Sequence, residues 1–304
     1  MICSGCMVIA FSLLGLFGSK NSILDLFSHF RLQYGLYLLF ISPLILKRKR
    51  LFLAFCTVAA CNLILVALLY IPSHENEATL SGAWHKLTLL DMNINFQNEN
   101  PTKINKEIES VSPDVVVIEE LTAPLFQAMQ PALAAYPYRV FTLRADPFGI
   151  GIFSKQRFLS SDANPLKLPV PFAISAVIQP GDKPVEIIAV HLLPPLRLAY
   201  ADINKGMADQ IGEAAHDFAG SVLIVGDLNA TPWSALFTRL VKASGLRDSE
   251  TGFGLQRTWP CGDPLLQIPI DHCLLSSDCK VADRTVGDDI ASDHKPVLFK
   301  LLVP

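Results

Sequence analysis

The sequence has few charged residues, and they are unevenly distributed along the chain. Only 17% of the 304 residues are Asp, Glu, Lys or Arg, against a usual share of about 25%. Up to Pro72 there are six basic residues and a single acid, Asp25, so this part has a net charge of +5. The rest has 19 basic and 27 acidic residues, a net charge of −8. The chain therefore divides into a basic, apolar N-terminal part and an acidic remainder.

Several common signatures are missing, and each absence argues against a class of function. There is no glycine-rich loop of the Walker type, which argues against an ATP-driven reaction. The acidic part lacks a basic run for phosphate contacts, so tight binding of duplex DNA is not expected. Its three cysteines, Cys261, Cys273 and Cys279, form no CxxC pair. That argues against a zinc site and leaves one disulfide possible outside the cytoplasm.

The N-terminal part contains three long apolar segments. Leu51–Ile71 has 21 residues and no charge, and about 20 apolar residues suffice to span a bilayer. Met1–Phe17 and Leu32–Leu46 are shorter, so each could instead be a tilted or interfacial helix. Met1–Phe17 lacks the basic start of a signal peptide. We expect three transmembrane helices.

The run Lys47–Arg50 (KRKR) separates the second apolar segment from the third. Short basic loops stay in the cytoplasm, so the third helix should carry the chain outward. We therefore expect a multi-pass membrane anchor over residues 1–72, in the inner or plasma membrane. A polar linker over 73–85 and a periplasmic or extracellular domain over 86–304 should follow.

From Lys86 onward, short apolar runs alternate with amphipathic stretches and turn residues. Strands are expected at Lys86–Met92, Val115–Ile118, Tyr138–Leu143, Ile150–Ser154, Ile174–Gln179, Val185–Val190, Val222–Val225, Ile270–Leu275 and Val297–Leu301. Helices are expected at Thr102–Ser110, Pro124–Ala135, Ala199–Phe218 and Ser234–Ala243. Strands outnumber helices, which favours an α/β fold of two packed mixed sheets with helices outside, a four-layer α/β/β/α sandwich.

Polar motifs follow several of these strands, and their order along the chain is informative. They are LDMNIN, PDVVVIEEL, GIGIFSK, AVHL, VGDLNATPWS, TWP, PIDHCLLS and ASDHKPV. In this order they resemble the endonuclease/exonuclease/phosphatase superfamily, which includes pancreatic-type deoxyribonuclease, abasic-site endonuclease, bacterial sphingomyelinase and inositol-polyphosphate phosphatases. The resemblance covers about residues 86–303. The RTWP stretch and the apolar N-terminal segments look like the membrane-anchored bacterial branch.

The resemblance implies a metal-dependent phosphoester hydrolase, because an anionic phosphodiester needs its oxygens neutralised before water attacks. Mg²⁺ or Mn²⁺ suits that task and prefers carboxylate oxygens. Glu120 is the expected ligand, because the family motif aligns on the second of the two acids and Glu119 should point the other way by strand alternation. Asn93 and Asp293 would complete the metal and phosphate shell. Asn95 stands where the family often has Asp, which argues against a second metal.

The same resemblance assigns catalytic roles. Asp227 would orient or deprotonate the attacking water, and Asn229 would donate a hydrogen bond to the phosphate. Asp271 and His294 form an acid–imidazole pair, in which His294 either activates water or stabilises charge as an imidazolium. His191 would hydrogen-bond a phosphoryl oxygen or protonate the leaving group. Asn93, Asn229 and His191 are thus the expected substrate-binding residues.

The substrate class stays open at this level. A phosphodiesterase acting on nucleic acid, with endonuclease activity included, is one interpretation. A lipid or small-molecule phosphoesterase is the other, because a tether at the bilayer raises the effective substrate concentration. A catalytically inactive binding protein is disfavoured because Glu120, Asp227, Asp271 and His294 are all present. The expected partners are the phosphoester substrate and the lipid bilayer, and no obligate protein partner is evident.

Overall fold

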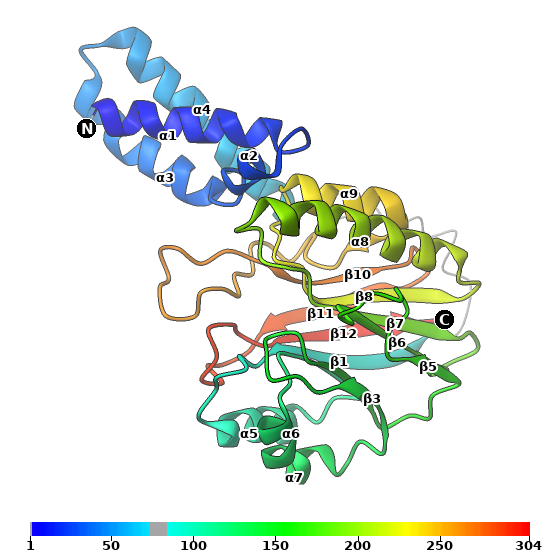
Figure 1. The fold of residues 1–304 in the computed structure, drawn as a ribbon. Coiled ribbons are helices and arrows are strands. Elements are labelled where there is room, and N and C mark those ends of the chain that lie inside the picture. The colour runs from blue at the N-terminus through cyan, green and yellow to red at the C-terminus, as the bar shows by residue number, and fades with distance from the viewer. Residues whose placement is uncertain (1, 73–83) are drawn as a thin grey trace.

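The chain folds as an N-terminal helical bundle followed by a sandwich of two β-sheets (Figure 1). The computed structural model describes residues 2–72 and 84–304. Most of the linker expected over 73–85 lies outside the described residues, and His85 already belongs to the first strand.

Two six-stranded sheets form the sandwich. The first has the order β11-β12-β1-β2-β4-β3 and the second the order β5-β6-β7-β8-β10-β9. The first contains β1 (His85–Asn93), β2 (Val115–Glu119), β3 (Tyr138–Thr142), β4 (Ile150–Ser154), β11 (Lys280–Val286) and β12 (Val297–Val303). The second contains β5 (Ser160–Asp162), β6 (Ala173–Ile178), β7 (Val185–Val190), β8 (Ser221–Asp227), β9 (Arg247–Asp248) and β10 (Asp271–Leu275). Only β1–β2 and β7–β8 pair in parallel within the described strands, so both sheets are mixed.

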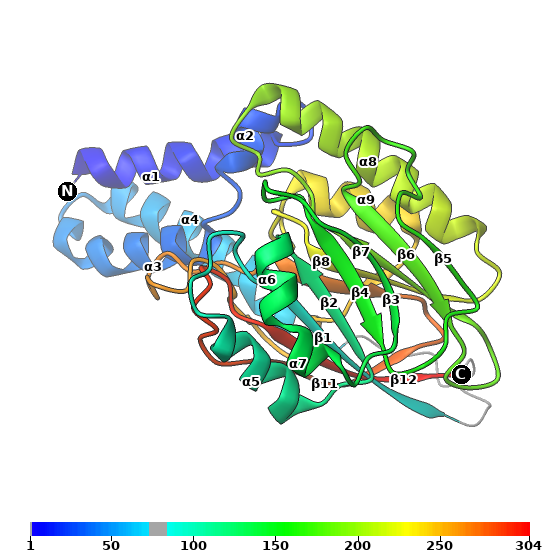
Figure 2. The ribbon, with the colours of Figure 1, turned by 60° about the horizontal axis from the view of Figure 1, so that its bottom comes forward.

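Helices cover the outer face of each sheet, which gives four layers (Figure 2). Leu87 and Leu89 of β1 belong to the core between the sheets, whereas Leu90 and Met92 belong to the core under α5 (Pro101–Val111), α6 (Ala123–Ala128) and α7 (Gln130–Leu133). A third core lies under α8 (Leu198–Asp217) and α9 (Ala235–Ser244). Burial on both faces explains why the strands read as nearly continuous apolar runs. The predicted α/β/β/α sandwich is confirmed.

The strands that the sequence did not predict, β5, β9 and β11, all lie at sheet edges. An edge strand needs a ladder partner on one side only and can expose polar side chains to solvent, so its sequence carries little apolar signal. The helix expected over Pro124–Ala135 is in fact two, α6 and α7, which meet at Met129. Pro131 has no N–H for the next helical hydrogen bond, so the helix is interrupted there. Cys261, Cys273 and Cys279 are free thiols.

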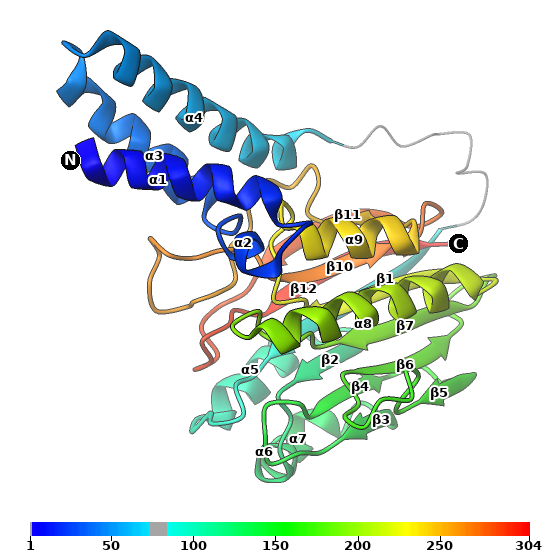
Figure 3. The same ribbon diagram turned by 45° about the horizontal axis from the view of Figure 1, so that its top comes forward.

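The N-terminal bundle contains the three predicted apolar helices (Figure 3). They are α1 (Ile2–Leu14), α3 (Arg31–Ile41) and α4 (Lys49–Ala67), with the short α2 (Ser22–Leu26) and the 3₁₀ turns η1 (Gly15–Phe17), η2 (Ser42–Ile45) and η3 (Leu68–Tyr70). Among the described residues, the helix Lys49–Tyr70 alone has the length and apolar composition of a membrane span. Ile2–Phe17 is a shorter apolar helix.

Hydrogen bonds join the bundle directly to the sandwich. Asp25 accepts from the backbone N–H groups of Ala235 and Leu236 at the start of α9, at 2.8 and 3.3 Å. The carboxylate therefore caps a helix that lies about two hundred residues away in the chain. At the other end of the contact, the Leu69 carbonyl accepts from the N–H groups of Gly252 and Gly254, at 2.8 and 3.0 Å.

Candidate active site

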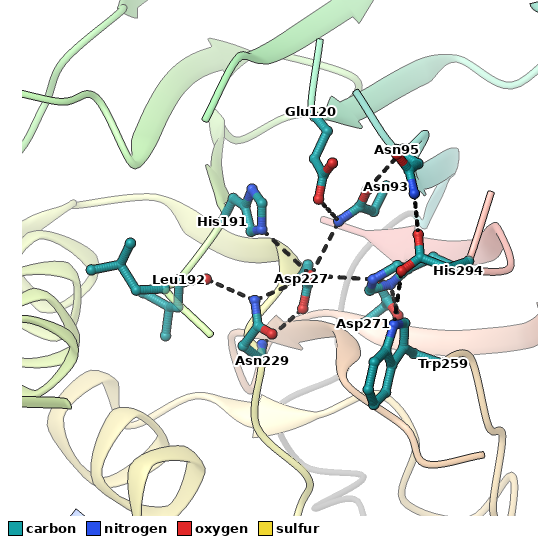
Figure 4. A network of polar contacts seen from close by, with 12 residues as sticks. Asn93, Asn95, Glu120, His191, Leu192, Asp227, Asn229, Trp259, Asp271 and His294 are labelled. Carbon is teal, nitrogen blue, oxygen red and sulfur yellow. Dashed lines mark hydrogen bonds and ion pairs between the residues drawn. The ribbon is translucent and has the colours of Figure 1, made fainter. Parts of the chain in front are cut away.

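The polar residues that follow the strands of both sheets meet at one edge of the sandwich (Figure 4). The first sheet supplies Asn93 at the end of β1, Glu120 after β2, and Asp293 and His294 before β12. The second supplies His191 after β7, Asp227 at the end of β8, Asn229 beyond it, and Asp271 at the start of β10. All of the site residues predicted from the sequence are therefore brought into one region.

Left-handed backbone conformations occur at Glu120 and Asn229 and at the neighbouring Asn95, with φ of 62°, 47° and 57° respectively. Such a conformation costs a side-chain-bearing residue about 1–2 kcal/mol. Local hydrogen bonds offset that cost. The Asn229 N–H donates to Asp227 Oδ1 at 2.8 Å, and the Phe96 N–H donates to Glu120 Oε2 at 2.9 Å. These turns direct the side chains beyond the strands into the site.

Around Glu120, the amides of two asparagines connect three carboxylates. Asn93 Nδ2 donates to Glu120 Oε1 at 3.1 Å and to Asp227 Oδ2 at 3.2 Å, while its Oδ1 accepts from the Asn95 N–H at 3.1 Å. Asn95 Nδ2 donates to Asp293 Oδ1 at 2.8 Å. Because Asn93 presents its nitrogen to the two carboxylates, its geometry favours the predicted phosphate-binding role over metal ligation.

Asp227 lies at the centre of the network. Besides Asn93 and Asn229, both histidines approach its Oδ2 atom, with His191 Nε2 at 3.5 Å and His294 Nε2 at 3.6 Å. Asn229 Nδ2 also donates to the Leu192 carbonyl at 2.8 Å, which ties Asn229 to the strand end that carries His191. The carboxylate is thus within reach of every predicted catalytic side chain of the second sheet.

Asp271 and His294 form the predicted acid–imidazole pair. His294 Nδ1 lies 3.0 and 3.1 Å from the two Asp271 oxygens, so the Nδ1–H donates to the carboxylate and Nε2 faces Asp227. Both residues are buried, with His294 5% exposed and Asp271 2% exposed. The Ser292 hydroxyl donates to the Asn93 carbonyl and accepts from the His294 N–H, which holds this loop against β1.

The surroundings drive the two histidines to opposite charge states. Burial lowers the pKa of His191 to about 4, with a further contribution from the charge of His294. Burial also acts to lower the pKa of His294, but the charges of Asp271 and Asp227 outweigh it and raise the pKa to about 10. At neutral pH, His191 is therefore a neutral imidazole and His294 an imidazolium.

The surroundings also give the carboxylic acids of the site different pKa values. Burial raises the pKa of Asp227 to about 7, against the opposing charge of His294. Burial alone would raise the pKa of Asp271, but the charge and hydrogen bond of His294 lower it. Burial raises the pKa of Glu120, and the hydrogen bonds from Phe96 and Asn93 reduce that rise. One acid that titrates near neutrality lies beside an imidazolium, a combination common at catalytic centres.

The donor set fits a divalent cation. Four carboxylates (Glu120, Asp227, Asp271 and Asp293) share the site with a single imidazolium, so the site has an excess of negative charge. Oxygen-rich, acidic surroundings of this kind suit Mg²⁺ or Mn²⁺. Oxygen and nitrogen atoms of Asp227, Asp271 and His294 lie within 4.8 Å of one another. Which of these residues hold the ion stays a prediction.

Three further residues lie next to the site but were not predicted as site members from the sequence. The Trp259 indole N–H donates to Asp293 Oδ2 at 3.0 Å, which places the tryptophan of the TWP motif beside the site. Asp91 and Glu119 form a buried acid pair beneath the site. Burial is the main cause that raises both pKa values, and repulsion from neighbouring acids adds to it. Strand alternation correctly predicts that Glu119 points away from Glu120, but it does not predict that Asp91 lies beside Glu119.

A second carboxylate–histidine cluster lies on the opposite face of β10. It consists of Asp248, Glu250 and His272, with Arg284 beside it. His272 Nε2 donates to the Ala230 carbonyl at 2.9 Å, and its Nδ1 is 3.9 Å from Asp248 Oδ1. The sequence places His272 on the face opposite Asp271 but offers no motif for the cluster.

Comparisons with known proteins agree with this geometry. The sequence profile of the Endonuclease/Exonuclease/phosphatase family matches residues 92–294. No curated protein matches this chain. Among solved structures, D. rerio TDP2 in complex with a single-strand DNA product has a TM-score of 0.60 at 15% identity, over 71% of this chain and 98% of that one.

Two further structures give the same result. A family protein from Bacteroides vulgatus has a TM-score of 0.60 at 16% identity, covering 72% of this chain and 99% of its own. The human Nocturnin catalytic domain with a bound sulfate has a TM-score of 0.58 at 16% identity, covering 71% and 94%. These structures are similar in fold. Together with the profile match across nearly all of the sandwich, they show that the chain belongs to the endonuclease/exonuclease/phosphatase family, whose members hydrolyse phosphoester bonds.

Proposed function

We propose that this protein is a metal-dependent phosphodiesterase whose catalytic domain is held at the outer surface of a membrane. The observation that carries the enzymatic part is the convergence of Glu120, His191, Asp227, Asp271 and His294 into one hydrogen-bonded network. These residues come from both sheets and are separated by up to 174 positions in the chain. A degenerate binding protein would have no need to keep this set together.

In this mechanism Asp227 accepts the proton of the attacking water. Its pKa of about 7 suits a general base near neutral pH, where a substantial fraction is ionised and still basic. The N–H of Asn229 and the amide of Asn93 fix the carboxylate in place. Asp227 therefore both orients the water and takes its proton.

The charge states separate the roles of the histidines. His294, held as an imidazolium by Asp271, stabilises the negative charge that grows on the phosphoryl oxygens. This favours charge stabilisation over water activation, the two roles that the sequence leaves open. A His191 pKa of about 4 makes it a poor proton donor at neutral pH. We infer that it donates a hydrogen bond to a phosphoryl oxygen through Nε2.

Mg²⁺ or Mn²⁺ would be held chiefly by Glu120. Asp293, which accepts a hydrogen bond from Asn95, would be a further ligand. When bound, it would neutralise phosphoryl oxygen charge and help the leaving oxygen depart.

Membrane attachment is supported by the arrangement of the bundle. Gln33 near the start of α3 and Leu69 after α4 both hydrogen-bond the sandwich, so Lys47–Arg50 between these helices must lie at the far end of the bundle. A basic loop at that end favours a cytoplasmic location for it, with the catalytic domain outside. An alkaline-phosphatase fusion after Pro72 should be active in cells, and an inactive fusion would refute this orientation.

For the substrate, one observation favours a phosphoester at the bilayer surface over nucleic acid. Leu265 and Leu196 are 80% and 79% exposed, on loops that follow Trp259 and His191 respectively. Gln33 Nε2 donates to the Leu265 carbonyl at 3.1 Å, which holds that loop beside an apolar helix. Exposed leucines at this level suit contact with lipid. Against this, TDP2 has been solved with a DNA product, so nucleic acid remains the other candidate.

The decisive assay uses the full chain in detergent, because the bundle hydrogen-bonds the loop after Asn229 through His29 and Thr231. It should be supplied with Mg²⁺ or Mn²⁺ and tested on DNA, RNA, sphingomyelin and phosphoinositides. Turnover of a lipid alone would establish the bilayer-surface substrate, and turnover of nucleic acid alone would establish the nuclease. If no phosphoester is cleaved with either metal, the enzymatic proposal is wrong.

A further inference from the structure

A cavity of about 590 Å³ lies between the N-terminal bundle and the helices over the second sheet. Its walls come from η1 and α2 on one side and from α8 and α9 on the other, with Leu65 of α4 closing a third. None of the catalytic residues described above lines this cavity. Its walls are basic and apolar, whereas the catalytic network is acidic.

Arg31 lines this cavity and carries a buried charge that forms no direct ion pair with a described residue, although the charge of Asp25 acts on it from a distance. Its side chain is 4% exposed. Nη1 donates to the Ser12 carbonyl at 3.0 Å, to the Ser12 hydroxyl at 3.3 Å and to Asn62 Oδ1 at 3.1 Å, all of which are uncharged. Nε has no hydrogen-bond partner within the described part of the chain. A buried guanidinium in such surroundings favours the binding of an anion.

The rest of the lining adds to the positive charge. Lys205, Arg239 and Lys242 line the cavity from α8 and α9. Lys205 lies 3.5 Å from Asp202 and Arg239 is paired with Asp209 at 2.6 Å, whereas Lys242 is exposed and forms no ion pair with any described residue. Asp25 is the sole acid among the described residues of the lining, and both of its oxygens already accept N–H groups of α9. The cavity therefore has a net positive charge.

The opposite wall is apolar and continues onto the outside of the bundle. Leu16 is 62% exposed and Leu65 is 37% exposed, and both lie near the ends of their helices that face the sandwich. If the bundle spans the membrane as proposed, these leucines lie where hydrocarbon gives way to headgroups. A ligand that satisfies both walls needs an anionic head and an apolar chain.

We propose that this cavity binds one anionic phospholipid, with its phosphate near Arg31, Lys205 and Lys242 and its acyl chains against Leu16 and Leu65. Guanidinium and ammonium groups are the usual partners of phosphate oxygens. The proposal rests on the membrane location proposed above and is independent of the hydrolytic activity. A bound lipid would join the bundle to α8 and α9 and so fix the catalytic domain relative to the bilayer.

The test uses the full chain in a non-ionic detergent, titrated with phosphatidylglycerol and followed by native mass spectrometry and thermal unfolding. Phosphatidylcholine, glycerol 3-phosphate and inorganic phosphate are the comparison ligands. We expect one phosphatidylglycerol to bind and raise Tm, with little effect of the other three. An equal effect of phosphatidylcholine would overturn the role of the headgroup charge, and an equal effect of either soluble phosphate would overturn the lipid as its source.

Variants then locate the site. Lys205→Ala and Lys242→Ala remove one charge each from the lining and should each weaken phosphatidylglycerol binding about fivefold. Lys106→Ala removes an exposed lysine from α5, on the opposite side of the sandwich, and should leave binding unchanged. Hydrolysis of a soluble phosphodiester in detergent should be the same in all three, so loss of the lipid site is read separately from loss of activity. Unchanged affinity in both cavity variants would overturn the proposal.

Discussion

Asp271 and His272 are neighbours on β10, yet their side chains enter two different carboxylate–histidine clusters. Asp271 joins Asp227 and His294, and His272 joins Asp248 and Glu250. The two clusters contain the same kinds of ligand atoms at similar spacing. They differ in what surrounds them, and that difference separates the proposed catalytic centre from the cluster of His272.

The cluster of His272 is balanced and closed. Arg284 lies beside it, and this guanidinium also donates to the Asp271 carbonyl at 2.9 Å. Glu250 and His272 are 0% exposed, and Arg284 is 1% exposed. The cluster of Asp271, in contrast, has more acids than cations and continues through Asn93 to the half-buried Glu120 and through Asn95 to the exposed Asp293. Unbalanced charge and access to solvent are what a metal and a substrate require.

The largest expected effect comes from the same substitution made in each cluster. Asp227→Asn should reduce kcat by about 10²–10⁴-fold, because it removes the proton acceptor while preserving shape. Asp248→Asn, the matched change in the other cluster, should leave kcat within a few-fold. Circular dichroism and thermal unfolding would verify that both variants fold. Equal losses of activity would show that the two clusters are not functionally distinct.

The next largest effect, tenfold to hundredfold, is expected on the metal concentration that the enzyme needs. Glu120→Gln should raise the Mg²⁺ concentration needed for half-maximal activity by about 10–100-fold, a range typical of weakened metal sites. Glu119→Gln changes the neighbouring residue, which is buried between the sheets, and should leave the metal requirement unchanged. EDTA should abolish activity, and Mg²⁺ or Mn²⁺ should restore it. Activity that persists after chelation would contradict the role of the cation.

The pH dependence should also separate the clusters. Because Asp227 must be ionised to accept a proton, kcat/KM should rise about tenfold per pH unit below its pKa of about 7 and level off above it. It should fall again as His294 loses its proton near pH 10. A pH–rate profile on a soluble phosphodiester measures both limbs. Asp248→Asn should keep the same profile, and a profile that is flat from pH 5 to 8 would exclude Asp227 as the base.

The smallest effect is on stability and belongs to the second cluster. Burial raises the pKa of Glu250 from 4.5 to about 7, despite the opposing charge of Arg284. A raised folded-state pKa means that the stabilising contribution is full below pH 4.5 and is lost as pH rises through 7. Glutamine cannot ionise, so the Tm of Glu250→Gln minus the Tm of the natural protein should increase by about 2–4 °C as the pH rises from 5 to 8. Differential scanning calorimetry would test this, and a difference that shrinks with pH would disprove the assignment.

The correct predictions from the sequence are those that depend on burial and local geometry. Most of the nine predicted strands are apolar on both faces, which made them recognisable, and β4 and β7 agree to the residue. The three missed strands are edges, where solvent replaces one neighbour. Ser234 marks the start of α9 because its hydroxyl accepts from the Phe237 N–H, a local interaction that a sequence can show.

Tertiary structure decided what each polar group meets. The sequence names Asp227, Asp271 and His294, but only their packing sets which of them carries a proton, since a pKa depends on burial and on charges that arrive from distant strands. Strand alternation in the sequence predicts that His272 points away from the site. It does not predict that Arg284 and Glu250, which come from other parts of the chain, lie beside His272. The apolar helices and the strand pattern follow from local sequence, whereas the charge balance of each cluster and the basic cavity around Arg31 exist only once the chain has folded. Hydrophobic periodicity acts over a few residues, and electrostatic balance depends on contacts between residues hundreds of positions apart.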